Sequence, residues 1–116
     1  MGASPEKVGT SFQERWGIHT FPPVAFDYRL LRDYDVVVVQ GRRVPKLLFE
    51  RGSAQAKVYI VEDGQFDLGR VAAEGGGGSV SARTEVRPAD RAGFHYVIVY
   101  TGESLEPFLN GGPGAD

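Results

Sequence analysis

Residues 35–62 read DVVVVQGRRVPKLLFERGSAQAKVYIVE, and this stretch decides the fold. Its first part, Val36–Val39, is four β-branched residues in a row, a composition that favours an extended, doubly buried strand over a helix. Two glycine-containing segments, Gln40–Arg43 and Arg51–Gln55, interrupt the apolar runs and supply turns. The stretch therefore predicts three successive strands that zigzag side by side.

The second and third strands of this meander are expected at Val44–Glu50 and Ala56–Glu62. Both faces of the second strand are partly apolar, which predicts partial cover on both. In the third strand we expect the alternate set that begins at Val58 to face the core. Pro45 has no amide hydrogen for a ladder, so it is expected at a sheet edge or at a strand entry.

Composition limits the architecture and the function. A chain of 116 residues with 41% hydrophobic and 24% charged residues is expected to form one globular domain. A net charge of -2 does not favour nucleic-acid binding. The sequence has no cysteine, which excludes disulfides, thiolate metal sites and cysteine nucleophiles. It has no apolar run of roughly 20 residues, so we expect no membrane span in this chain.

The N-terminal residues have the features of a helix. Ser4 and Pro5 are typical of an N-cap and a first helical position. Val8, Phe12 and Trp16 follow at intervals of four residues and would form one apolar stripe. A mobile N-terminal segment is the alternative. We therefore assign residues 1–23 to a helix or mobile segment followed by a proline-containing linker.

The remaining segments complete a prediction of the α+β class. We expect short helices over 24–34 and 65–74, a final turn or short helix over 104–109, and strands over 80–87 and 94–101 that pair as a hairpin. Residues 75–79, GGGGS, have the composition of a flexible connector and are identical to an engineered linker repeat, so natural and engineered origins both remain open. The predicted fold is a largely antiparallel sheet of about five strands, with short helices at the N-terminus, in the middle and at the C-terminus. Residues 24–109 would form this single domain, and 110–116 a flexible tail.

The sequence contains no set of residues that points to catalysis. A metal site needs several donors at suitable spacing, but the histidines are His19 and His95 alone. Ser104 lacks the glycine two residues later that a nucleophile elbow requires, so a helix cap is the better interpretation. The tetraglycine run is not followed by the Gly-Lys-Ser/Thr of a phosphate-binding loop. We therefore predict no catalytic, cofactor-binding or metal-binding residues and no enzymatic activity.

Two groups of residues are candidates for contact with a partner protein. Arg42, Arg43 and Lys46 form the one local basic cluster, which suits a carboxylate or phosphate on a partner; a solvated hairpin turn is the alternative. Trp16 and Phe21 belong to a group of aromatic residues crowded into the first third of the chain. These aromatic side chains pack either on the sheet of their own domain or on another protein.

Four segments resemble a known family: 40–49, 56–60, 65–68 and 96–105. They resemble the uncharacterised C-terminal domain that follows the membrane helix in bacterial, planctomycete-type anti-sigma-factor-like proteins. The resemblance covers roughly residues 27–109 and consists of strand and turn residues. It implies a non-enzymatic protein-interaction or sensory domain with a protein partner and no cofactor. It also implies an extracytoplasmic location if the chain is part of a longer membrane protein; otherwise we expect the cytoplasm.

Other functional classes remain open. The second hypothesis is a small accessory subunit of a larger assembly, in which residues 12–26 wrap a neighbouring protein. The third is a small enzyme, which the absence of an acid, base and nucleophile set disfavours. The oligomeric state is not predicted.

Overall fold

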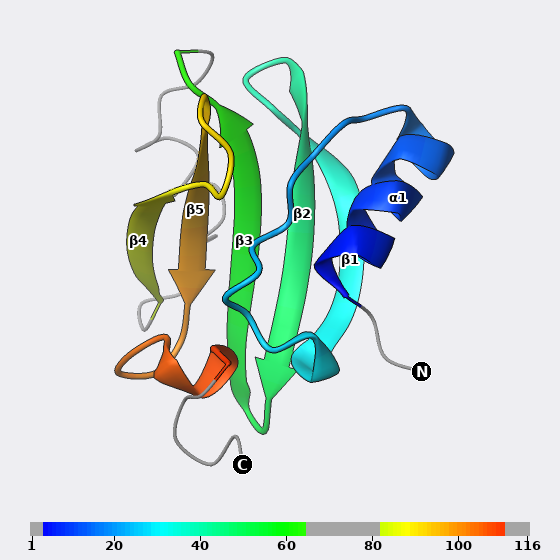
Figure 1. Ribbon diagram of the computed structural model, residues 1–116. Helices are drawn as coiled ribbons and strands as arrows, with labels where there is room; N and C mark the ends of the chain where they lie inside the picture. The colour runs from blue at the N-terminus through cyan, green and yellow to red at the C-terminus, as the bar shows by residue number, and fades with distance from the viewer. Residues whose placement is uncertain (1–3, 65–81, 111–116) are drawn as a thin grey trace.

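The described part of the chain forms a five-stranded antiparallel sheet with one α-helix on one face (Figure 1). The computed structural model describes residues 4–64 and 82–110. The α+β class is confirmed, as is the number of strands. In chain order the elements are α1 (Pro5–Trp16), the 3-10 turn η1 (Tyr28–Leu30), β1 (Leu31–Val39), β2 (Arg42–Arg51), β3 (Ala54–Glu62), β4 (Arg83–Pro88), β5 (Phe94–Tyr100) and the 3-10 turn η2 (Glu106–Phe108).

The predicted meander forms one half of the sheet. The strand order is β1-β2-β3-β5-β4, and every neighbouring pair is antiparallel. The predicted hairpin of the last two strands is confirmed, and β5 joins it to the meander by pairing with β3. The meander therefore supplies three adjacent strands and leaves β1 at one end of the sheet.

The position of β1 corrects one prediction. The valine run is extended as expected, but it is not doubly buried, because Val38 is 70% exposed. The prediction failed because an end strand has a neighbour on one side alone, so its burial depends on what covers its faces. Pro45 does not lie at a sheet edge or a strand entry as expected: it lies inside β2, a strand between two neighbours, and the ladder to β3 begins one residue later at Lys46. A proline is tolerated there because no ladder bond requires its missing amide hydrogen.

Helix α1 begins and ends as the sequence indicates. The Ser4 side chain accepts a hydrogen bond from the amide of Lys7 at 3.2 Å, and Gly17 ends the helix in the left-handed conformation with φ of 68°. Val8 and Phe12 are buried on the sheet. The helix is thus part of the same folded unit as the strands, not a mobile segment.

The sheet has an apolar cluster on each face. The cluster on the α1 side joins Val8 and Phe12 of the helix to Val58 and Ile60 of β3 and to Phe49 of β2. The opposite face buries a second cluster: Val39, Val44, Tyr59, Val61, Val97 and Val99. The prediction that one alternate set of β3 faces the core is therefore incomplete, since both sets are buried.

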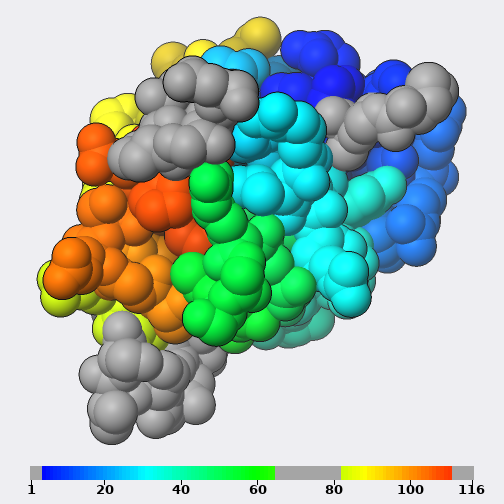
Figure 2. All heavy atoms as spheres, turned by 90° about the horizontal axis from the view of Figure 1, so that it is seen from below, coloured from blue at the N-terminus to red at the C-terminus, as the bar shows by residue number. Residues whose placement is uncertain are grey.

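Two predicted helices are shorter or differently placed. Within 24–34 the chain forms the three-residue turn η1 and then enters β1, because pairing with β2 outweighs the helical spacing of its apolar residues. The C-terminal helix is the turn η2, where the Ser104 hydroxyl accepts the amide of Glu106 at 3.3 Å. Figure 2 shows both turns from below, beside the β2–β3 connection. The predicted helix over 65–74 and the glycine run over 75–79 lie outside the described residues.

Candidate functional site

The outer side of β1 carries no strand pairing within the described residues. The β1–β2 turn determines which backbone groups point to that side. Gln40 and Gly41 have φ of 53° and 77°, which makes the connection a two-residue hairpin closed by the last residue of β1 and the first of β2. The closing pair exchanges both backbone hydrogen bonds, and bonded and non-bonded pairs alternate from there. Val36 and Val38 therefore point their amide and carbonyl groups away from β2.

Two contacts support this assignment. Val36 lies opposite Pro45, which has no N–H and cannot form a fully bonded pair. The amide of Val36 instead donates to Oδ1 of Asp35 at 2.7 Å. The Asp35 carboxylate thus accepts the outward N–H of Val36, which is then not available to an added strand. At Val38 no hydrogen bond from another element of the described chain reaches the outward backbone groups.

The structure brings some of the predicted partner-binding residues together and separates others. Nη1 of Arg43 donates to the carbonyl of Trp16 at 3.2 Å, which ties the β1–β2 turn to the end of α1. Arg42 is exposed at the same turn. Lys46 lies two residues from Val44 of the second apolar cluster and four from Arg42, so strand alternation places all three on that face of the sheet. Arg43 lies on the α1 face, so Lys46 does not join it in one surface.

Phe21 lies apart from that turn, on the extended segment after α1. Its ring is 5.8 Å from the ring of Phe94, and the guanidinium carbon of Arg91 lies 4.9 Å from its centroid. Trp16 is half-buried, with its ring 5.1 Å from that of Phe12. Both predicted aromatic residues thus pack largely on their own domain.

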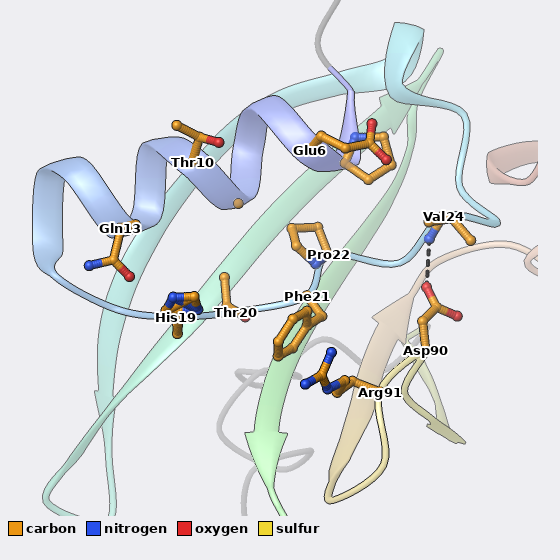
Figure 3. A pocket seen from close by; sticks show the side chains of 12 residues that line it. Glu6, Thr10, Gln13, His19, Thr20, Phe21, Pro22, Val24, Asp90 and Arg91 are labelled. Atoms are coloured by element: carbon orange, nitrogen blue, oxygen red, sulfur yellow. Dashed lines mark hydrogen bonds between the residues drawn. The ribbon is translucent and has the colours of Figure 1, made fainter.

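A groove of about 470 Å³ opens between α1 and the segment of residues 19–24 (Figure 3). The two lie close together: a β-carbon at Gly9 would be 3.4 Å from the carbonyl oxygen of Thr20, an ordinary van der Waals contact. Phe21, Pro22 and Val24 are among the apolar residues that line the groove. A volume of this size is within the usual range for small-ligand sites, which is about 300–1,000 Å³.

A hydrogen-bonded network holds the groove's wall to the β4–β5 loop. The hydroxyl of Tyr96 donates to the carbonyl of Phe21 at 2.6 Å and lies 3.2 Å from Oδ2 of Asp90. The same carboxylate oxygen accepts the amide of Val24 at 2.9 Å. Burial raises the pKa of the Tyr96 phenol above its ordinary value, so the phenol remains a donor. The sequence did not indicate Tyr96 or Asp90, because the network joins residues that are far apart in the chain.

Catalytic features are few in the described part of the chain. No group of three or more histidine, cysteine or acidic residues in 4–64 and 82–110 is arranged to hold a metal ion. His95 pairs with Asp63, and His19 lies on the segment that follows α1. Within those residues no helix is long and apolar enough to cross a membrane.

We compared the chain with protein-family models, with curated proteins and with solved structures, and none of the three comparisons gave a match. Function is therefore inferred from the β1 edge, the β1–β2 turn and the grooves of this structure.

Proposed function

We propose that this chain is a non-enzymatic protein-interaction domain that binds an extended segment of a partner protein as an added strand along β1. The observation that carries the proposal is the outward backbone of Val38 on a strand of nine residues that has no outer neighbour among the described residues. Unpaired strand edges bind extended peptides through main-chain hydrogen bonds. Exposed valine side chains beside them supply apolar contact.

The character of the β1 edge supports this function over the alternatives. Its second half is apolar and extended up to the hairpin turn, and Val38 exposes 70% of its surface. The turn at its end presents Arg42 and Arg43, which suit acidic residues flanking the bound strand. The predicted resemblance to the C-terminal domain of anti-sigma-factor-like proteins is in keeping with a binding role and stays a prediction.

The accessory-subunit hypothesis depends on residues 12–26 wrapping a neighbour. These residues instead cover their own sheet: Phe12, Thr20 and Phe26 are buried, and Trp16 and Phe21 pack against neighbouring side chains. We therefore do not propose that role for this segment.

The proposal is tested by selecting peptide ligands from a random library and measuring their affinity by calorimetry. Val38→Pro removes an outward amide hydrogen without removing a β1–β2 bond, so we expect a loss of about tenfold or more in affinity. Val38→Thr keeps the amide and the β-branched shape and is the matched control. Equal affinity of the parent and Val38→Pro chains would contradict binding at this edge.

A second variant should act in the opposite direction. Asp35→Ala releases the amide of Val36 for an incoming strand, and we expect affinity to rise by about two- to fivefold. Asp33→Ala, which removes an acidic side chain from the same strand, controls for the change in charge. A gain of the same size in both variants would indicate electrostatics in place of an uncovered amide.

A further inference from the structure

A second hollow lies under the β1–β2 turn and is not used by strand addition. Its volume is about 630 Å³, and we refer to it as the hairpin hollow. Ile18, Ile60 and Phe94 are among its apolar walls. Arg42 and Arg43 line it at the turn. It therefore combines an apolar interior with the permanent positive charge of Arg43, which strand alternation places on the face of Ile60.

The charge around the hairpin hollow favours an anion. Among its described lining residues, Glu62 is the one acidic side chain, against Arg43 on the same face and Arg42 at the turn. Arg43 uses Nη1 for the carbonyl of Trp16, which leaves its other guanidinium donors for a ligand. The planar guanidinium matches a carboxylate with two parallel hydrogen bonds.

An independent observation concerns Thr20, which lines both the hairpin hollow and the groove beside α1. The residue is 8% exposed, and its hydroxyl oxygen has no hydrogen-bond partner in the structure. A buried hydroxyl without a partner costs about 1–3 kcal/mol and requires an explanation. The oxygen itself is buried, so a ligand in the hollow reaches it after the Thr20 side chain rotates, and a ligand atom that then accepts its hydrogen would remove that cost.

We propose that the hairpin hollow binds a small organic carboxylate whose apolar body lies against Ile60 and Phe94 and whose carboxylate is bound by Arg43 and the Thr20 hydroxyl, beside Arg42 at the turn. The apolar walls exclude a bare inorganic anion as the best ligand, because such an anion would leave them in contact with water. The site and the β1 edge share the arginines of the turn, but the edge depends on the backbone of Val38 and the site on the Thr20 hydroxyl, so the two proposals can fail separately.

The first test is a titration followed by two-dimensional amide NMR spectra at constant ionic strength. The probes are sodium benzoate, neutral benzamide and inorganic phosphate. We expect benzoate to give saturable shifts at residues 18–20 and 41–43, and to bind about tenfold more tightly than either other probe. Non-saturating shifts, or equal binding of benzoate and phosphate, would overturn the proposal.

Charge variants should change benzoate affinity in opposite directions. Arg43→Gln should weaken benzoate by about five- to tenfold, whereas Glu62→Gln should strengthen it by about twofold or more. Arg83→Gln makes the same change of charge on β4 and should leave benzoate binding unchanged. Equal losses in the Arg43 and Arg83 variants would show non-specific attraction and contradict the site.

The last variant separates binding from folding. Thr20→Val removes the unpartnered hydroxyl at nearly constant volume, so we expect a higher midpoint of thermal unfolding and about threefold or greater loss of benzoate affinity. An unchanged affinity would exclude the hydroxyl from the site and contradict the proposal as stated. A lower midpoint would also contradict it, because it would mean that the hydroxyl already has a partner in the folded chain.

Discussion

The two end strands of the sheet, β1 and β4, are protected in different ways. β4 has six residues, alternates Arg83, Glu85 and Arg87, and ends at Pro88; Glu85 and Arg87 form an ion pair along it. β1 has nine residues, and its second half is valine with a single carboxylate, that of Asp35, bonded to an edge amide. Charges and proline discourage pairing with another strand. The comparison indicates that β4 is closed to added strands and β1 is open to them.

The largest expected effect concerns the support of β1 by α1. Phe12 is fully buried, with its ring 5.5 Å from that of Tyr34 on β1. Phe12→Ala should lower the free energy of unfolding by about 3–5 kcal/mol, because it leaves a cavity. Amide hydrogen exchange should then increase in β1 before β4. Val86→Ala, at a site 44% exposed on β4, is the control and should change stability by about 0.5 kcal/mol or less.

The second effect would make the two edges alike. Replacing Glu85 and Arg87 together by valine should open β4 to pairing, and we expect about a tenfold increase in self-association by sedimentation. The double glutamine variant loses the same ion pair without adding apolar surface. If the glutamine variant associates equally, the ion pair and not the polar surface protects β4.

A smaller effect concerns the turn that ends β1. Gly41 has φ of 77°, so Gly41→Ala should cost about 1 kcal/mol of stability through backbone strain and loosen the β1–β2 hairpin. Gly9→Ala in α1, where no positive φ is required, is the matched control and should be neutral or slightly stabilising. Urea unfolding of both variants measures the difference. Equal changes would argue against strain at the turn.

The smallest effect concerns acid. The side-chain hydrogen bond from Arg29 lowers the pKa of Asp27, whose carboxylate caps the turn that leads into β1. Because the pKa of Asp27 is lower in the folded state than in the unfolded state, its ionised carboxylate stabilises the fold above pH about 3.9, the unfolded-state pKa. This stabilisation is lost as the pH falls from there through the folded-state pKa. Amide hydrogen exchange should therefore increase at the start of β1, and not in β4, as the pH is lowered through this range. Arg29→Gln should reduce that difference, and equal acid sensitivity of the two strands would contradict it.

Local patterns in the sequence were sufficient for most of the fold. The valine run, the glycine turns and the Ser4 cap each act within a few residues, so strands and α1 could be predicted. The exposure of Val38 could not be predicted, because it depends on which strand ends the sheet. The helix expected over 24–34 failed for the same reason: pairing of β1 with β2 decided the conformation of that segment.

The candidate sites were less accessible to prediction than the fold. The sequence indicated Arg42 and Arg43 and grouped both with Lys46, but strand alternation places Arg43 on the face opposite to Arg42 and Lys46. The capping of Val36 by Asp35 and the unpartnered hydroxyl of Thr20 depend on three-dimensional contacts. Their positions in the fold, and not their residue types, make these residues candidates for a site.

The chain has a single tryptophan, and the fold places it where it can report on both proposals. The carbonyl of Trp16 accepts a hydrogen bond from Arg43 at the β1–β2 turn. The guanidinium carbon of Arg15 lies 4.5 Å from the centroid of the Trp16 indole. An occupant that draws Arg43 away, or a strand that shifts the turn, changes the polarity around that indole. The wavelength of its emission is therefore an intrinsic optical signal of events at the hairpin, with no label attached to the protein.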